Sequence, residues 1–414
     1  MIRRVKGTQD FLDLTLFNFF IAQSKEHLAQ YHFNEIATPI IEPTELFKRS
    51  LGLETDIVTK EMYTLNTESE SICLRPEGTA STVRAFIENG IQTVPWKVFL
   101  WGPMFRHERP QKGRYRQFHQ LSLEVIGSDS IAQDAHMIAM LDRLFSDRFK
   151  LDSYALHINF LGTMEDRAAF RKILEKFLNE HVDQICATCK VRKDKNIMRV
   201  YDCKEVSCQT LYRKAPVLTE YLSKASADEW QQLQEYLDST NVAYTVMPTL
   251  VRGLDYYNKT VFEFVSPHLG AQSAFCGGGR YDHLVSALGG KKDQPSVGAA
   301  IGIERMLLLL DPIKDALPIY KEPRLHVIMP LSTDQHTLAL LIAYQTLQHG
   351  LYTEVLLEGD SVKSMMRKAN KLGATYCLLI GSEEQDNKTV KVKHMTTGEE
   401  ATVAHADLIA YLQQ

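Results

Sequence analysis

A β-hairpin is predicted between Val98 and Gly127, where hydrophobic and polar residues alternate on both sides of a polar loop. In the second arm, the polar residues Gln120, Ser122 and Glu124 alternate with Leu121, Leu123 and Val125. A period of two places the two kinds of side chain on opposite faces of a strand. We therefore expect the apolar face to join a core and the polar face to line a pocket.

The loop of this hairpin is rich in cations. It carries Arg106, Arg109, Lys112, Arg114 and Arg116 around the single acid Glu108. The planar fork of arginine matches a phosphate or a carboxylate through two parallel hydrogen bonds. The alternative is a solvated hairpin whose arginines only keep an edge soluble. The excess of arginine over lysine favours a nucleotide-binding or phosphate-binding site.

Upstream of the hairpin, helical and strand patterns alternate. A helix reaching about Tyr31 precedes a strand-like segment at 35–41, in which Pro39 is typical of an edge or an interface. A helix start is predicted at 43–47. The apolar run at 72–80 ends in a turn before a further helix, so Glu77 lies at a strand-to-helix junction. An acid there either presents a functional side chain or caps the helix.

Downstream, a long helix is predicted at 131–149 and a helical insertion from about 163 to 244, since strand patterns resume at 251–257 and 260–265. Gly277 to Gly279 then favour a tight turn over the close approach of the backbone to a ligand. Arg305 enters an apolar helix. A buried arginine needs an anionic partner, which is either an internal carboxylate or a ligand phosphate.

A second domain is predicted after the prolines at 312, 318 and 323. From Leu325 onward, strands alternate with helices that end at glycine, which is the pattern of an α/β unit with a mainly parallel sheet. This domain carries no evident catalytic cluster, and we expect it to bind a partner.

Composition sets limits on the class of protein. The 414 residues are 44% hydrophobic and 24% charged, as in an ordinary globular protein with more than one domain. The net charge of -4 argues against a histone-like coat for nucleic acid, so any such binding must come from local basic surfaces. No window has the length of a membrane-spanning helix and no targeting peptide is recognised, and we expect a cytoplasmic protein.

The seven cysteines give no pattern of a disulfide scaffold. Cys186 and Cys189 form a CxxC pair, and Cys203 and Cys208 follow. A structural zinc site is one interpretation of these four residues. Free thiols are the interpretation that the sequence favours, and no metal ligand is assigned.

Several peptides together resemble one known family. Phe105 to Glu108 before a basic loop is similar to motif 2 of the class II aminoacyl-tRNA synthetases, GIERM at 302–306 to motif 3, and the segment around Pro39 to motif 1. VRGLDYY at 251–257 and GGRYD at 278–282 resemble the two signature peptides of the histidyl-tRNA synthetase family. Lys6 to Asp10 and LRPEGT at 74–79 also match, so the resemblance covers essentially the whole chain.

The resemblance implies a fold and a reaction. It implies an α+β catalytic domain at 1–318, with an antiparallel sheet flanked by helices and a helical insertion at about 163–244, and a C-terminal α/β anticodon-binding domain at 323–414. Members of the family are homodimers that use motif 1 at the interface. They join L-histidine and ATP into histidyl-adenylate, with Mg²⁺ accompanying the ATP, and transfer the histidyl group to tRNA(His).

The resemblance also implies roles for residues that match the family's motifs. Arg106 and Arg252 would flank the α-phosphate as catalytic residues. The ATP-binding residues would be Arg106, Glu108, Arg114 and Arg305. The histidine-binding residues would be Glu77, Thr79 and Gln120 at the α-ammonium group, Glu124 and Tyr257 at the imidazole nitrogens, and Tyr256 and Tyr281 along the same cavity. The remaining loop cations, Arg109, Lys112 and Arg116, are candidates for the acceptor end of tRNA.

Noncatalytic proteins remain alternatives. One is the regulatory subunit of ATP phosphoribosyltransferase, a paralogue built on the same catalytic fold, which is expected to lack the anticodon domain and parts of the arginine and glutamate set. An accessory scaffold or signalling paralogue would need further domains. The presence of both features favours the enzyme.

Overall fold

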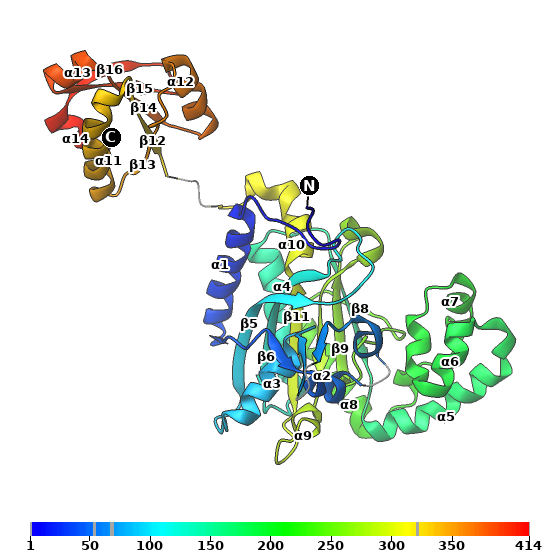
Figure 1. Cartoon of the computed structure of the whole chain (residues 1–414). Coiled ribbons are helices and arrows are strands. Elements are labelled where there is room, and N and C mark those ends of the chain that lie inside the picture. The colour runs from blue at the N-terminus through cyan, green and yellow to red at the C-terminus, as the bar shows by residue number, and fades with distance from the viewer. Residues whose placement is uncertain (1, 53–54, 67–69, 320–322, 414) are drawn as a thin grey trace. The chain divides into compact units, whose positions relative to one another are not determined.

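The computed structural model describes residues 2–52, 55–66, 70–319 and 323–413. The chain divides into two compact units, Met1–Ile319 and Tyr320–Gln414 (Figure 1).

An eight-stranded sheet forms the centre of the first unit, in the order β1-β5-β6-β11-β10-β9-β7-β8. Its strands are β1 (Asn34–Glu35), β5 (Trp96–Phe105), β6 (Gln117–Ile126), β7 (Ala155–Phe160), β8 (Thr245–Val246), β9 (Asn258–Val265), β10 (Ala274–Arg280) and β11 (Ser296–Gly302). All neighbours are antiparallel except the short edge strands β1 and β8, which run parallel to β5 and β7. The predicted antiparallel sheet and the hairpin β5–β6 are confirmed.

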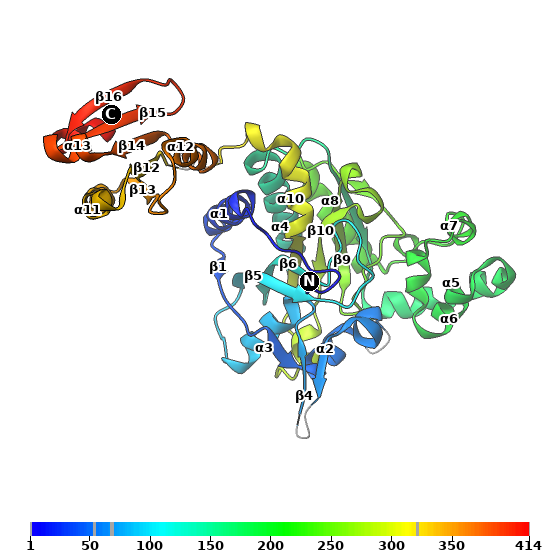
Figure 2. The ribbon, with the colours of Figure 1, turned by 45° about the horizontal axis from the view of Figure 1, so that its top comes forward.

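Helices cover one face of this sheet and bury the main core (Figure 2). They are α1 (Thr15–Gln30), α4 (Ile131–Arg143), which continues as a π-helical turn at Leu144–Arg148, α8 (Lys224–Ser239) and α10 (Ile303–Leu310). Their apolar residues pack on the sheet residues of the opposite layer, including Leu121, Leu123 and Val125. The apolar face of β6 is therefore a core face, as its alternation predicts.

A small three-stranded sheet and two helices lie on the other side. The sheet has the order β2 (Ile41–Pro43), β4 (Ser71–Leu74), β3 (Thr64–Asn66). In the chain, α2 (Thr44–Leu51) follows β2, and α3 (Thr79–Glu88) follows β4. Phe47 and Leu51 of α2 are fully buried in a separate apolar cluster with Cys73 and Ala80. Ile40, Ile41 and Leu65 remain exposed.

The predicted helical insertion contains two kinds of helix. The helices α5 (Met164–Glu180), α6 (Ala187–Lys195) and α7 (Val206–Tyr212), with the 3-10 segment Ile197–Asp202, form a lobe beside the sheet (Figure 1). The last helix, α8, instead packs on the sheet, because Leu233 and Leu237 belong to the main core.

Two local predictions differ from the structure. Residues 251–257 form a loop, with β9 beginning at Asn258, although their pattern indicates a strand. Gly277 to Gly279 lie inside β10 and not in a tight turn. The reason is packing: a Cβ at Gly278 would lie 2.2 Å from the carbonyl oxygen of Gly298, and one at Gly279 would lie 2.5 Å from that of Thr260. These glycines allow a flat, crowded strand, which turn chemistry alone does not reveal.

The second unit is an α/β fold around a five-stranded sheet of order β13-β12-β14-β15-β16. The strands are β12 (Leu325–Pro330), β13 (Tyr352–Val355), β14 (Tyr376–Ile380), β15 (Thr389–His394) and β16 (Glu400–Ala404), and the helices are α11 (His336–Gln348), α12 (Val362–Lys371), α13 (Ser382–Asn387) and α14 (Leu408–Leu412). The first three strands are parallel and the last two antiparallel, so the sheet is mixed. Within the described ranges, no helix of either unit is long and apolar enough to cross a membrane.

Candidate functional site

A cavity of about 490 Å³ lies in the first unit against the polar side of the central sheet. Side chains from β6, from the hairpin loop, from the loop at 251–257 and from the start of α10 line it. The sequence-predicted site residues therefore come together although they are far apart in the chain. Ten line the cavity, namely Glu77, Thr79, Arg106, Glu108, Arg114, Gln120, Arg252, Tyr256, Tyr257 and Arg305.

Strand register explains how the polar face of β6 becomes hollow. On the β11 side, Gln120 pairs with Gly302, Ser122 with Ala300, and Glu124 with Gly298. Small residues beside each polar side chain leave space above the sheet, because neighbours across a strand pair lie close together. The polar face of β6 therefore borders open space because β11 presents only glycine and alanine beside it.

Glu124 and Tyr281 lie just behind this wall and are almost fully buried. The Glu124 carboxylate accepts the hydroxyl of Thr79 at 2.6 Å and that of Tyr281 at 2.5 Å. A Cβ at Gly298 would lie 1.7 Å from Oε2 of Glu124, so only glycine leaves room for this carboxylate. Burial raises the pKa of Glu124 to about 8, and the two hydroxyl donors counter only part of that effect.

The position of Tyr281 is fixed by contacts of the residue before it in the chain. The preceding residue, Arg280, is buried and forms ion pairs with Asp134 at the start of α4 and with Asp282. A buried arginine is stable only when its charge is paired in this way. The signature peptide at 278–282 thus serves to hold Tyr281 against Glu124.

Glu77 caps the helix that follows it. Its carboxylate accepts the backbone N–H groups of Thr79 and Ala80, both at 2.7 Å, at the start of α3. Such bonds satisfy amide groups that the first turn of a helix leaves unpaired. Burial raises the pKa of Glu77, and these amide donors counter only part of that effect. The capping alternative from the sequence is therefore present, and the same carboxylate still borders the cavity.

Arg252 reaches the cavity from the loop before β9. It forms an ion pair with Glu263 of β9, and a Cβ at Gly277 would lie 2.5 Å from its Nη2. Burial disfavours the charged guanidinium, but Glu263 together with Tyr257, Tyr256 and Cys276 outweighs the effect of burial, and the pKa of Arg252 is raised. Gly277 thus provides the space in which Arg252 lies flat on the sheet.

The other arginines gather around the hairpin loop. Arg106 donates its Nε–H to the carbonyl of Pro76 at 2.9 Å, Arg114 pairs with Glu108, and Arg305 donates to the carbonyl of Gly113 at 2.9 Å. Burial lowers the pKa of Arg305, and the charges of Arg114 and Arg106 lower it further. Cations that destabilise one another at the wall of a cavity favour an anionic ligand.

Apart from Oε2 of Glu108, which forms an ion pair with Arg114, two buried polar atoms of cavity-lining residues lack hydrogen-bond partners among the described residues. One is the Nε donor of Arg252 and the other is the amide oxygen of Gln120. Buried polar atoms are nearly always paired in native proteins. The cavity therefore offers one donor for an anion and one acceptor for a cation or other donor.

Three tyrosine rings pack against one another beside the cavity, in tilted and edge-to-face arrangements. Tyr256 lies against Tyr257 with ring centroids 4.5 Å apart and against Tyr281 at 5.6 Å. Burial raises the pKa of Tyr257 to about 12, so its hydroxyl stays protonated at neutral pH. These rings make a wall suited to a planar or aromatic group with hydrogen-bonding edges.

Several residues that line the cavity are not predicted from the sequence. Glu263, which pairs with Arg252, alternates along β9 with Phe262 and Phe264 of the core, so its strand period already indicates the polar side. Glu304, which accepts from the backbone N–H of His119 at 2.9 Å, lies in the motif 3 peptide. Arg199 and Lys204 come from the insertion, and nothing in the local sequence indicates that they reach this cavity.

The three remaining loop cations behave differently from one another. Arg109 and Lys112 are exposed, whereas Arg116 is half-buried. Arg116 donates its Nε–H to the carbonyl of Glu108 at 3.3 Å, and its backbone N–H bonds to Gly7. Only Arg109 and Lys112 are therefore free to meet a large partner without rearrangement of the loop.

Comparison with known proteins gives a consistent result over the whole chain. The family model "Histidyl-tRNA synthetase" matches residues 22–306, and the model "Anticodon binding domain" matches residues 326–414. A curated histidine-tRNA ligase of Clostridium perfringens is 40% identical over 409 residues, covering 97% of both chains. That of Halothermothrix orenii is 41% identical over 425 residues, covering 100% of this chain and 99% of the relative.

Solved structures agree. Apo histidyl-tRNA synthetase of S. aureus is 33% identical, with a TM-score of 0.82 and 100% of both chains covered. A protein from Bacillus halodurans described as an ATP phosphoribosyltransferase regulatory subunit/histidyl-tRNA synthetase has a TM-score of 0.62 at 20% identity, which shows a shared fold alone. The regulatory-subunit alternative is not favoured, because the full-length curated relatives are ligases. The chain belongs to the histidyl-tRNA synthetase family.

Proposed function

We propose that this chain ligates L-histidine to its cognate tRNA in two steps, through a histidyl-adenylate formed from ATP in the cavity of the first unit. As a family member, the chain is an aminoacyl-tRNA ligase for histidine. The observation that supports the site is the pair of unsatisfied atoms on one cavity, the Nε donor of Arg252 and the amide oxygen of Gln120. Histidyl-adenylate carries both an anionic phosphate and an α-ammonium group, which complement these two atoms.

In the first step, the histidine carboxylate attacks the α-phosphorus and pyrophosphate leaves. No general base is required, since a carboxylate is already ionised at pH 7. Arg252 and Arg106 are the catalytic residues in this proposal, because they stabilise the charge that develops on the α-phosphate oxygens. Arg252 is suited to this task since Glu263 fixes one side of its guanidinium while Nε stays available.

The amino acid lies over β6 in this proposal. Gln120 accepts from the α-ammonium group, with Glu77 and Thr79 beside it. Glu124 and Tyr257 bond the two imidazole nitrogens, and Tyr256 and Tyr281 line the space. Each carboxylate oxygen has a second acceptor position, so Glu124 accepts an imidazole N–H while keeping Thr79 and Tyr281.

ATP occupies the arginine side of the cavity. Glu108 accepts from the adenine amino group, and Arg114 and Arg305 hold the outer phosphates. The present pairing of Arg114 with Glu108 then separates, each side chain taking its own part of the nucleotide. Mg²⁺ arrives with ATP and is held chiefly by phosphate oxygens and water, as is usual for this ion. We assign it no protein ligand.

The second unit, the hairpin loop and the segment around β2 have the remaining roles in this proposal. The second unit binds the tRNA anticodon, and Arg109 and Lys112 meet the acceptor end. Two copies of the chain pair through the segment around β2, where Ile40, Ile41 and Leu65 are exposed. Exposed apolar residues gathered at one place mark interaction sites. The mass measured by light scattering during gel filtration tests whether the protein is a dimer. We expect the protein in the cytoplasm.

Exchange of pyrophosphate into ATP tests the chemistry. Purified protein with Mg²⁺ is expected to catalyse exchange only when histidine is present. No histidine-dependent exchange at any magnesium concentration would contradict the proposed reaction. Exchange with histidine but no charging of tRNA would instead restrict the failure to the second step.

A further inference from the structure

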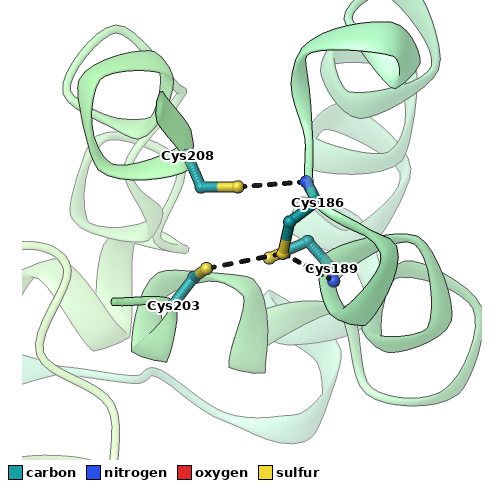
Figure 3. Close-up of side chains that lie close together, drawn as sticks. All are labelled: Cys186, Cys189, Cys203 and Cys208. Atoms are coloured by element: carbon teal, nitrogen blue, oxygen red, sulfur yellow. Dashed lines mark hydrogen bonds between the residues drawn. The ribbon is translucent and has the colours of Figure 1, made fainter. Parts of the chain in front are cut away.

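Four cysteines of the insertion converge on one point (Figure 3). Cys186 precedes α6, Cys189 lies in its first turn, Cys203 follows the 3-10 segment Ile197–Asp202, and Cys208 lies on α7. Their Sγ atoms all lie within 4.8 Å of one another. Three of the four residues are buried, and Cys186 is partly exposed.

The spacing of the sulfur atoms fits a metal ion. Zinc bonds thiolate sulfur at about 2.3 Å in tetrahedral sites, which places neighbouring sulfur atoms about 3.8 Å apart. The Sγ atoms of Cys186 and Cys203 are 3.7 Å apart. The CxxC and CxxxxC spacings also fall within those common for zinc ligands. We propose that Cys186, Cys189, Cys203 and Cys208 bind one Zn²⁺ as a structural site in the insertion.

Backbone amides around the cluster point to sulfur. The N–H of Cys186 donates to Sγ of Cys208 at 3.2 Å, and the N–H of Cys189 donates to Sγ of Cys186 at 3.4 Å (Figure 3). Donors of this kind favour the thiolate over the thiol. Lys190 and Lys204 each follow a cysteine directly in the sequence and carry positive charge, whereas a zinc ion with four thiolates is negative overall. The thiol protons pass to solvent when the metal binds.

Two other interpretations explain less. A disulfide requires sulfur atoms about 2.05 Å apart, whereas all seven cysteines are free thiols here. Buried thiols that only fill a core need no common centre, yet these four residues from separate segments meet at one point. The sequence favours free thiols because the second pair is spaced CxxxxC and the segment lies away from the basic loop.

The site has a structural task. The two helices that carry ligands, α6 and α7, are short, and helices of this length are marginal on their own. The segment Ile197–Asp202 is held between two of the ligands and carries Arg199, which donates Nη2–H to the carbonyl of Gly253 at 2.6 Å and pairs with Asp255. Arg199 and Lys204 border the cavity. The metal thus fixes a segment that supports the loop of Arg252.

Metal content of the full chain tests the proposal directly. Protein purified without chelator is expected to hold about one zinc per chain, as measured by inductively coupled plasma mass spectrometry. Cys208→Ser is expected to lose most of that zinc. Cys377→Ser is the matched control, since Cys377 is buried in the second unit, and it is expected to keep the metal. Wild-type protein with iron or with no metal would overturn the proposal, as would full zinc content in Cys208→Ser.

Two measurements on the wild-type chain do not depend on the folding of a variant. Cobalt substituted for zinc is expected to show the intense visible bands of tetrahedral thiolate coordination. Chelation is expected to expose the basic residues at 190–204 to trypsin while the rest of the first unit stays resistant, because metal binding and local folding are coupled. Octahedral cobalt spectra, or equal proteolysis with and without metal, would refute a structural thiolate site.

Discussion

Replacing Glu124 with glutamine should remove the pH dependence of histidine binding. The pKa of Glu124 in the free protein is raised to about 8 by burial, so this carboxyl is mostly protonated at pH 7. If the ionised form accepts an imidazole N–H, histidine must displace that proton. One pKa unit corresponds to a tenfold change in the ionised fraction, so wild-type affinity should rise about eightfold between pH 7.0 and 8.5.

Isothermal titration calorimetry measures this linkage. In two buffers of different ionisation enthalpy at pH 7.0, wild-type protein should release close to one proton per histidine bound. Glu124→Gln cannot ionise and should show weaker binding with a flat profile across the same window. Any titration of histidine itself is common to both proteins and cancels in the comparison.

The stability of the protein without histidine should fall as the pH rises, whereas its affinity for histidine should increase. Because the folded-state pKa of Glu124 lies above its ordinary value of 4.5, its contribution is complete below about pH 4.5 and is lost as the pH rises through about 8. Thermal unfolding between pH 6 and 9 should show this loss in the wild type and a smaller one in Glu124→Gln. An identical pH slope for histidine affinity in both proteins would refute the assignment of Glu124.

Further predictions concern space and charge. Gly298→Ala places a Cβ 1.7 Å from Oε2 of Glu124 and should raise the KM for histidine about tenfold to a hundredfold, the loss of one hydrogen bond to a charged group, with little change for ATP. Gly359→Ala in the second unit is the control, since no atom apart from its chain neighbours lies within 4 Å of the added Cβ, and similar kinetics for the two variants would contradict the steric argument. Alanine at both Arg109 and Lys112 should leave pyrophosphate exchange intact but weaken tRNA charging and reduce its salt dependence. Unchanged salt dependence would remove these two residues from the tRNA contact.

The sequence predicts the hairpin well because its physical signal is local. Alternation along 120–125 already separates the core face from the polar face, and the structure confirms the core face, while on the polar face Gln120 lines the cavity and Ser122 and Glu124 are buried. The contribution of the partner strand, β11, has no such local signal. That Gly298 leaves room for Glu124 depends on the register between β6 and β11, and register is set by the whole sheet.

Long-range contacts explain most of what the sequence does not predict. The loop at 251–257 has a strand-like pattern because Leu254 and Tyr256 pack on the cavity side, not because they pair in a sheet. Arg199 reaches the cavity from a charged helical insertion, where nothing local distinguishes it from solvated neighbours. The four cysteines converge only once α6 and α7 are in place.

Pyrophosphate exchange by Arg252→Ala tests whether this arginine acts on the α-phosphate. Exchange is expected to fall by about a thousandfold, since removal of a preorganised charge at a developing oxyanion costs on this order, while histidine affinity stays within about twofold. Arg143→Ala, an exposed arginine on α4, is the matched control and should behave as the wild type. Exchange within about tenfold of wild type, or an equal loss of histidine affinity, would show that Arg252 does not act on the α-phosphate.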